Sequence, residues 1–240
     1  MGEAEYPLHL QLPTRRARVF FVRHGEPDVY GEDTPLTENG VHQVEEFADQ
    51  FADILAGDKR SKLVKILRSD RLRTGQTARV IEGRVRNKLK AHELANVELK
   101  RNIPVRKFIA PDNTIDAVLS QGVSLSDAYN IWIYLGRDDA AKIGAKWSGE
   151  VASEAFGLTS KLGGYINEVP EGPDLYYVLA THETTLGAIL LHADIEGTDK
   201  IRYAQHIEME PVDRDVLVKS GNAVSVVHLR SLENGISQTI

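Results

Sequence analysis

The stretch that decides the fold is Val19-Phe20-Phe21-Val22-Arg23-His24-Gly25-Glu26. Its apolar run predicts a buried strand that ends abruptly in Arg23, His24 and Gly25. Open α/β sheets bind ligands at the carboxyl ends of their strands, so we expect a guanidinium and an imidazole at such a site. Arginine offers phosphate oxygens a planar fork of donors, and histidine serves as a nucleophile or proton carrier. Gly25 permits a sharp turn and a close backbone approach to an anion.

Two further apolar runs end in the same way. Leu63–Leu67 leads into the polar residues Ser69–Arg73, and Tyr176–Ala180 leads into Thr181, His182 and Glu183. In a parallel sheet these ends lie on one edge, so side chains far apart in the sequence converge there. The converging set contains two arginines, two histidines and a carboxylate. Such a set predicts a phosphate site, because guanidinium donors match phosphate oxygens bidentately.

Helices are expected between these strands and after them. The clearest begins at Thr37, a typical N-cap residue, and ends at Gly57; others are expected at residues 71–85, 151–169 and 184–192. The alternating apolar residues 216–229 predict a hairpin. The alternation of strand and helix predicts an α/β fold, a three-layer α/β/α sandwich with a mostly parallel central sheet. Residues 86–150 are interpreted as an inserted cap outside the sheet core, within one domain spanning residues 1–240.

Composition excludes several classes of protein. The chain is 42% hydrophobic and 27% charged, which is typical of a soluble globular protein, and no apolar stretch approaches the length of a membrane helix. Its acidic amino terminus lacks the apolar core of a signal peptide, so we expect a cytoplasmic protein. With 0 cysteines, disulfides, a thiol nucleophile and thiolate metal sites are excluded.

The charges are distributed unevenly along the sequence. Residues 59–107 contain 16 Lys and Arg against 4 Asp and Glu, although the whole chain has a net charge of −6. This segment is interpreted mainly as a solvated helix surface, and secondly as a positive field that steers an anionic substrate. No nucleic-acid partner is expected, because the segment lacks interleaved aromatic residues.

The residue types at the three strand ends suggest a chemistry. A neutral histidine attacks phosphorus in line and carries the phosphoryl group, while arginines and the second histidine stabilise its oxygens. A carboxylic acid protonates the leaving group and then activates water. Two histidines among arginines do not suggest a metal site, because the arginines would repel a cation.

At these residues the chain resembles the histidine phosphatase superfamily, the phosphoglycerate-mutase-like group. The resemblance covers residues 18–85 and 150–230 and rests on four ordered motifs: residues 22–26, residues 33–40 with Gln43, residues 69–78, and residues 181–185. It implies that His24 is the nucleophile and that Arg23, Arg73 and His182 bind the phosphoryl group.

The sequence also departs from the patterns of the two family branches. Pro27 and Tyr30 stand where members of one or the other branch carry Arg or Asn. The proton donor is Glu183 if His182-Glu183-Thr184-Thr185 corresponds to the His-Asp-Thr-Thr of acid-phosphatase-like members. The alternatives are Glu93 and Glu98, which follow the second-arginine helix as the donor of mutase-like members does.

The sequence thus predicts a metal-independent phosphomonoesterase that uses a phosphohistidine on His24 and needs no cofactor. The expected substrate is a phosphorylated small molecule, with a phosphoprotein also considered, and no membrane partner is expected. A phosphoglycerate-type phosphomutase and a phospho-ligand binding or regulatory module are the alternatives. The substrate and the oligomeric state are not predicted.

Overall fold

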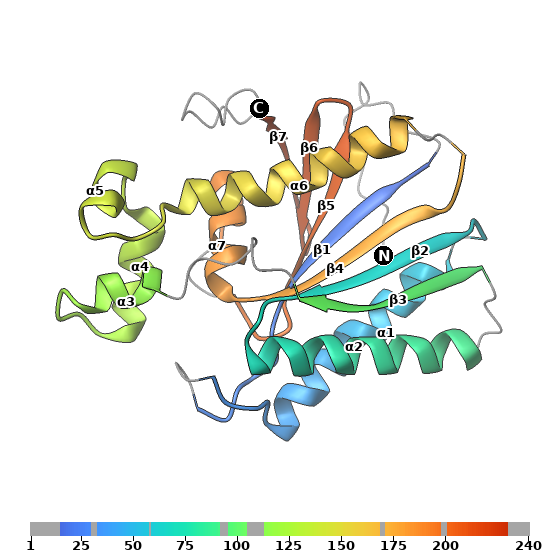
Figure 1. The fold of residues 1–240 in the computed structure, drawn as a ribbon, viewed down its shortest axis with the longest axis horizontal. Coiled ribbons are helices and arrows are strands. Elements are labelled where there is room, and N and C mark those ends of the chain that lie inside the picture. Colours follow the sequence, from blue (N-terminus) through green and yellow to red (C-terminus); the bar gives the residue numbers. More distant parts are fainter. Residues whose placement is uncertain are drawn as a thin grey trace.

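The computed structural model describes residues 15–29, 33–57, 59–91, 96–104, 113–168, 171–197 and 201–229. Helices and strands alternate through most of these ranges, and the elements expected from periodicity are all present (Figure 1). In chain order the elements are β1 (Ala17–Arg23), α1 (Glu38–Ala56), β2 (Lys62–Arg68), α2 (Leu72–Ala91), β3 (Val97–Pro104), α3 (Asn113–Leu119), α4 (Leu125–Tyr134), α5 (Arg137–Lys142), α6 (Ser148–Glu168), β4 (Asp174–Thr181), α7 (Glu183–His192), β5 (His206–Val212), β6 (Asp215–Ser220) and β7 (Ala223–His228).

The sheet has two halves of different character. Its strand order is β3-β2-β4-β1-β5-β6-β7. The pairings β3–β2, β2–β4 and β4–β1 are parallel, whereas β1–β5, β5–β6 and β6–β7 are antiparallel. The α/β class is therefore confirmed, but the mostly parallel sheet holds only for the first half. The three final strands follow one another through short connections, which suit antiparallel neighbours.

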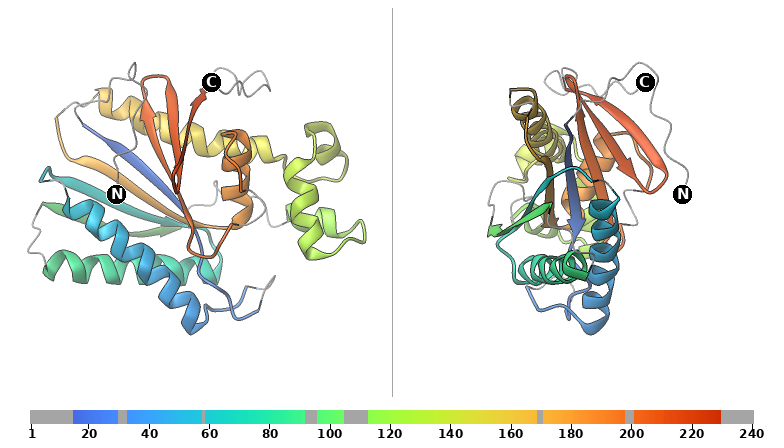
Figure 2. Two further views of the ribbon diagram at one scale, coloured as in Figure 1. Left: turned by 180° about the vertical axis from the view of Figure 1, so that it is seen from behind. Right: turned by 90° about the vertical axis from the view of Figure 1, so that its right-hand side faces the viewer.

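Helices cover both faces of the parallel half, which confirms the three layers. Figures 1 and 2 show α1 and α2 on one face and α6 on the other, with α7 beside α6. Along β1, Phe20 and Val22 pack into the core under α1 and α2, while Val19 and Phe21 pack into the core under α6 and α7. All four are fully buried, as expected of a parallel strand with both faces covered.

The boundaries expected for the cap need correction. Helix α2 continues to Ala91, and residues 97–104 form the edge strand β3, which pairs with β2, so this part of residues 86–150 belongs to the sheet. Glu98 and Lys100 of β3 are exposed, as expected where an edge strand faces solvent. Helices α3, α4 and α5 lie outside the sheet, beyond α7 (Figure 1). Trp132 of α4 is fully buried among them, and its indole N–H donates to the carbonyl of Lys146 at 2.7 Å.

No helix in the described part of the chain combines the length and the apolar character needed to cross a membrane.

Candidate active site

The sheet register brings the three strand ends together. Arg23 at the end of β1 lies opposite Thr181 at the end of β4, and Arg68 at the end of β2 lies opposite Ala180. The residues that follow these positions therefore meet at one edge. The ring centroids of His24 and His182 are 5.2 Å apart. The predicted convergence of the two imidazoles is thus present.

His24 is held with one nitrogen available for chemistry. Its Nδ1–H donates to the carbonyl oxygen of Gly25 at 2.7 Å, so in the neutral ring Nε2 carries the lone pair. The Nε–H of Arg73 donates to this Nε2 at 3.0 Å. Burial, together with the charges of Arg73 and Arg23, lowers the pKa of His24 to about 3. The imidazole is therefore neutral at neutral pH, as a nucleophile must be.

Close backbone packing fixes the turn after His24. A Cβ on Gly25 would overlap the carbonyl group of Gly40 in the first turn of α1, and a Cβ on Gly40 would overlap the backbone of Glu26. The amide N–H of Gly25 also donates to Oγ1 of Thr77 at 3.3 Å. Only glycines allow this approach of α1 to the strand end, so the pair sets the position of the His24 ring.

His182 occupies the N-cap position of α7 and is tied to the end of β2. Its Nε2 lies 3.1 Å from Oγ of Ser69, and that hydroxyl lies 2.6 Å from Oγ1 of Thr74. Burial, followed by the charges of His24, Arg73 and Arg71, lowers the pKa of His182 well below 6.5. A neutral His182 offers one ring N–H, so it acts at this site as a hydrogen-bond donor and not as a cation.

Arg23 is buried, 6% exposed, between an aromatic ring and a carboxylate. Its guanidinium carbon lies 4.0 Å from the centre of the Tyr203 ring, one Nη donates to the carbonyl of Ile201, and the other pairs with Glu183. Its buried Nε has no hydrogen-bond partner within the part of the chain that the structure describes. A buried N–H without a partner is costly, and a bound anion would remove that cost.

Tyr203 belongs to the site although no sequence motif indicates it. Its ring centroid lies 6.0 Å from that of His24. It stands in the loop before β5, which is fixed against β1 because the Arg23 amide donates to the carbonyl of Gln205 at 2.9 Å. Burial raises the pKa of Tyr203, and so do the nearby carboxylates Glu183 and Glu26, so the phenol stays protonated. Only the antiparallel pairing of β5 with β1 reveals this position.

Several motif residues hold the loop between β1 and α1 instead of facing the site. The side-chain carbonyl of Gln43 accepts from the Glu26 amide at 3.0 Å, and that of Gln76 accepts from the Leu36 amide at 2.7 Å. Pro27 forms an isolated bridge with Leu36. Tyr30 lies outside the described residues. The sequence motifs thus combine catalytic candidates with residues that shape the loop.

The three donor candidates differ in position. Glu183 starts α7 directly after His182 and is paired with Arg23, so it lies in the site. Glu98 lies opposite Leu63 near the start of β2, roughly 16 Å along the strand from Arg68 at 3.3 Å per residue, and pairs there with Lys100. The structure therefore places Glu98 away from the site. Glu93 lies outside the described residues.

The family model described as the histidine phosphatase superfamily, branch 1, matches residues 19–97, which contain the ends of β1 and β2. Residues 19–97 are therefore similar to this superfamily. No curated protein matches the chain. Among solved structures, the chain is similar to a phosphoglycerate mutase from Bacillus anthracis str. Sterne, with a TM-score of 0.53 and 17% identity over 92% of this chain and 97% of that chain. It is also similar to a mycobacterial glucosyl-3-phosphoglycerate phosphatase in complex with VO3, with a TM-score of 0.45 and 18% identity over 83% of this chain and 98% of that chain.

The first structural likeness shows that the chain shares the fold of the phosphoglycerate mutase over residues 19–97 and beyond them. His24, Arg23 and Arg73 lie inside the family match, whereas His182 and Glu183 lie beyond it and enter the site through the sheet register. Among the described residues, no group of three or more His, Asp or Glu side chains is arranged to hold a metal ion.

Proposed function

We propose that the protein is a phosphomonoesterase that acts without a metal ion, through a phosphohistidine on His24. The observation that carries this proposal is the pairing of a neutral imidazole Nε2 with the Arg73 guanidinium at 3.0 Å. In this arrangement a guanidinium lies at the atom that would attack phosphorus. A phosphoryl group drawn to Arg73 therefore arrives at the nucleophile.

In the first half of the proposed reaction, Nε2 of His24 attacks phosphorus and the bond from phosphorus to the ester oxygen breaks. Arg23 and Arg73 neutralise the equatorial oxygens, and His182 donates its ring N–H to one of them. The Nδ1–H bond to Gly25 holds the ring in the tautomer that this attack requires. Binding of the phosphate also supplies a partner for the buried Nε of Arg23.

Glu183 is the proposed proton donor to the leaving alkoxide. Its ion pair with Arg23 supports this role, because Arg23 is proposed to bind the phosphoryl group. When a phosphate dianion takes over Arg23, the carboxylate is left next to a like charge, and this favours uptake of a proton. The protonated Glu183 then delivers that proton to the ester oxygen as the bond to phosphorus breaks.

In the second half, the Glu183 carboxylate takes a proton from water. The water oxygen attacks phosphorus, the bond between phosphorus and Nε2 breaks, and inorganic phosphate leaves. His24 returns to its neutral form, and Glu183 is again protonated for the next leaving group. The proton that Glu183 gives to the leaving group is therefore replaced by the proton that it takes from water.

The test is an assay of p-nitrophenyl phosphate and of alkyl phosphates with and without EDTA, on wild type, His24→Ala and His42→Ala. His42 is a highly exposed histidine on α1 and serves as the matched control. We expect turnover in wild type and in His42→Ala, no effect of EDTA, and no turnover in His24→Ala. A ³²P label on the wild-type protein should be acid-labile and base-stable.

The fate of the label separates hydrolysis from the alternatives. Release of the label as inorganic phosphate is expected. Return of the label to a phosphorylated product would make the protein a phosphomutase. Binding of phosphoesters with neither label nor turnover would make it a binding module.

A further inference from the structure

Arg23 is covered by an aromatic ring more closely than any other cation among the described residues. Its guanidinium carbon lies 4.0 Å from the centre of the Tyr203 ring, whereas the other cation–π contacts in that part of the chain span 5.3 to 6.0 Å. At 4.0 Å the ring face is in van der Waals contact with the planar guanidinium. No step of the proposed reaction uses Tyr203.

The N–H donors of Arg23 are only partly occupied. Nη1 donates to the carbonyl of Ile201, and Nη2 pairs with Glu183. The buried Nε has no hydrogen-bond partner among the described residues. In a guanidinium, the N–H bonds of Nε and Nη2 leave the same edge and form a fork that matches two oxygens of a phosphate. One half of this fork is therefore open, and a phosphate that fills both halves takes Nη2 from Glu183.

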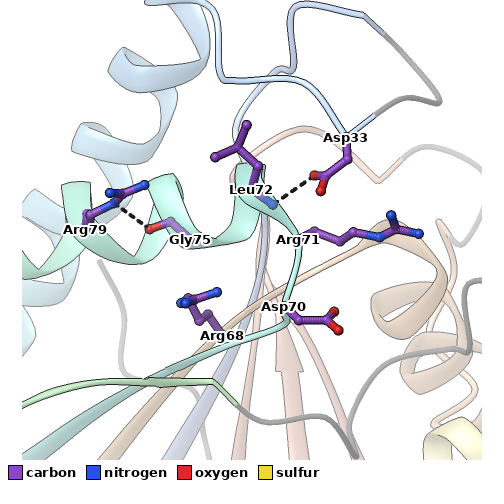
Figure 3. Close-up of a pocket in the computed structure, with 7 residues that line it drawn as sticks. All are labelled: Asp33, Arg68, Asp70, Arg71, Leu72, Gly75 and Arg79. Atoms are coloured by element: carbon purple, nitrogen blue, oxygen red, sulfur yellow. Dashed lines mark hydrogen bonds between the residues drawn. The ribbon is translucent and has the colours of Figure 1, made fainter.

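Other arginines of the molecule use their Nε within the protein. Nε of Arg84 donates to Asp49 at 2.7 Å. An open cavity of about 460 Å³ lies at the connection from β2 to α2, and Figure 3 shows Arg79 in its lining, with Nε donating to the carbonyl of Gly75 at 3.3 Å. Arg79 is exposed, whereas Arg23 is buried and keeps its Nε open. The open donor of Arg23 is therefore suited to a ligand.

The loop before β5 holds the Tyr203 ring against Arg23. The Arg23 amide donates to the carbonyl of Gln205 at 2.9 Å, and the Ala204 amide donates to that of His24 at 3.3 Å. Ala204 is buried and has a φ of 54°, a left-handed conformation that residues other than glycine rarely adopt. Such strain persists only where the surrounding structure fixes it, and it is concentrated at functional sites. The loop is thus fixed to the two residues that are proposed to act on phosphate.

We propose that Tyr203 is a positioning residue for Arg23, whose ring holds the guanidinium so that Nε and Nη2 bind two oxygens of one phosphoryl group. Stacking on an aromatic face restrains a planar guanidinium without using any of its N–H donors. The ring thereby reduces the side-chain entropy that Arg23 loses when the anion binds. This inference rests on the proposed function, because the phosphoryl group is the one that His24 attacks.

The test is a double-mutant cycle of Tyr203→Leu with Arg23→Lys. Lysine keeps a positive charge beside Glu183 but has no planar fork for a ring to orient. Calorimetry gives the affinity for inorganic phosphate, and turnover of p-nitrophenyl phosphate gives kcat and KM. Tyr203→Phe keeps the ring without the hydroxyl. Tyr165→Leu is the matched control, because Tyr165 also lies against an arginine, Arg15, which precedes β1 at the opposite end from Arg23.

With Arg23 present, Tyr203→Leu should weaken phosphate binding and lower kcat/KM by about fivefold or more, because a cation–π contact is strong where the cation is desolvated. With Arg23→Lys, the same change should cost less than about twofold, because the pair is coupled. Tyr203→Phe should stay within about twofold of wild type, since the ring remains. Tyr165→Leu should match wild type. If Tyr203→Leu or Arg23→Lys does not fold, Tyr203→Met or Arg23→Gln takes its place in the cycle.

Equal losses with Arg23 and with Lys at this position would overturn the proposal, because Tyr203 would then act independently of the fork. A loss in Tyr203→Phe as large as in Tyr203→Leu would also overturn it, since the hydroxyl would be responsible. Wild type that binds phosphate but hydrolyses no ester would refute the proposed function alone, and the cycle in phosphate affinity then decides the role of Tyr203. If phosphate binds too weakly for calorimetry, the cycle in kcat/KM decides it. If wild type neither binds phosphate nor hydrolyses the ester, both proposals fail.

Discussion

Two groups of charged side chains in this molecule differ in the partners of their arginines: a carboxylate in one group and a neutral imidazole in the other. In the antiparallel half, Arg18 makes two contacts of 2.7 Å with the Glu208 carboxylate, and Lys219 lies 3.5 Å from Glu208 and 3.7 Å from Glu210. At the ends of the parallel strands, Arg73 directs its Nε–H at an imidazole nitrogen of His24.

The difference indicates which of these arginines is suited to bind an anionic ligand. A bidentate contact with a carboxylate uses a guanidinium well, and such a pair stabilises position and register. The Nε–H of Arg73 faces a neutral imidazole nitrogen, and an anion would be a stronger acceptor for this donor. The same residue type is therefore structural beside Glu208 and poised for a ligand beside His24.

His24→Asn should have the largest effect, a loss of catalytic activity. Asn keeps a polar side chain in the turn but provides no nucleophile, so turnover of p-nitrophenyl phosphate should fall by about 10⁴-fold or more. Binding of inorganic phosphate, measured by calorimetry, should persist because Arg23, Arg73 and His182 remain. Retention of more than a tenth of the activity would rule out His24 as the nucleophile.

Arg18→Met should lower the stability of the fold and leave catalysis unchanged. Among the described residues, the substitution leaves the buried Glu208 carboxylate with Lys219 as its one cationic partner, and breaking a buried ion pair costs about 3 kcal/mol or more. Urea unfolding should therefore show a loss of this size. Arg18 lies near the start of β1, at the opposite end of the strand from His24, so kcat of the folded variant should match wild type. Lower kcat with unchanged stability would contradict the division of roles.

Glu183→Gln should sharpen the assignment of the proton donor. With an alkyl phosphate, whose leaving group needs a proton, kcat should fall by about 10²-fold or more. With p-nitrophenyl phosphate the loss should be below about tenfold, because nitrophenolate is a good leaving group. Glu98→Gln is the matched control and should leave both rates unchanged, since Glu98 lies near the start of β3. Equal losses with both esters would show that Glu183 acts only by positioning Arg23.

The sequence predicted the parallel half and most of the site because both depend on local signals. Each of β1, β2 and β4 is an apolar run followed by polar residues, and the parallel register then requires His24 and His182 to meet. Glu183 was predicted for the same reason.

The remaining elements depend on contacts that no local pattern reveals. In the sequence of β5, the charges of Glu208 and Glu210 suggest a surface segment. Both side chains are nevertheless buried, Glu208 beside Arg18 and Glu210 beside Lys219. Strand β3 carries charges typical of an edge and was interpreted as part of a cap. Tyr203 joins the site only because β5 pairs with β1. The position of Glu98 followed from the register of β3 alone.

The pH dependence of stability gives the smallest effect and tests the neutral state of His24. Burial lowers the pKa of His24 from 6.5 to about 3, so below pH 6.5 the unfolded chain binds a proton that the folded protein excludes. Stability must therefore fall as the pH falls through 6.5, and for this one histidine the loss between pH 7 and pH 5 is about 2 kcal/mol.

His24→Asn removes this contribution, whereas His182, His192 and His206, whose pKa values are also lowered by burial, retain theirs. Urea unfolding of wild type and His24→Asn at pH 7, 6 and 5 should show a shallower decline for the variant, with a difference of about 2 kcal/mol between the end points. The window stays above the range in which Glu208, whose pKa is lowered because Arg18 and Lys219 outweigh the effect of burial, takes up a proton. Parallel declines would mean that the folded protein accepts a proton on His24, and a protonated imidazole has no lone pair for phosphorus.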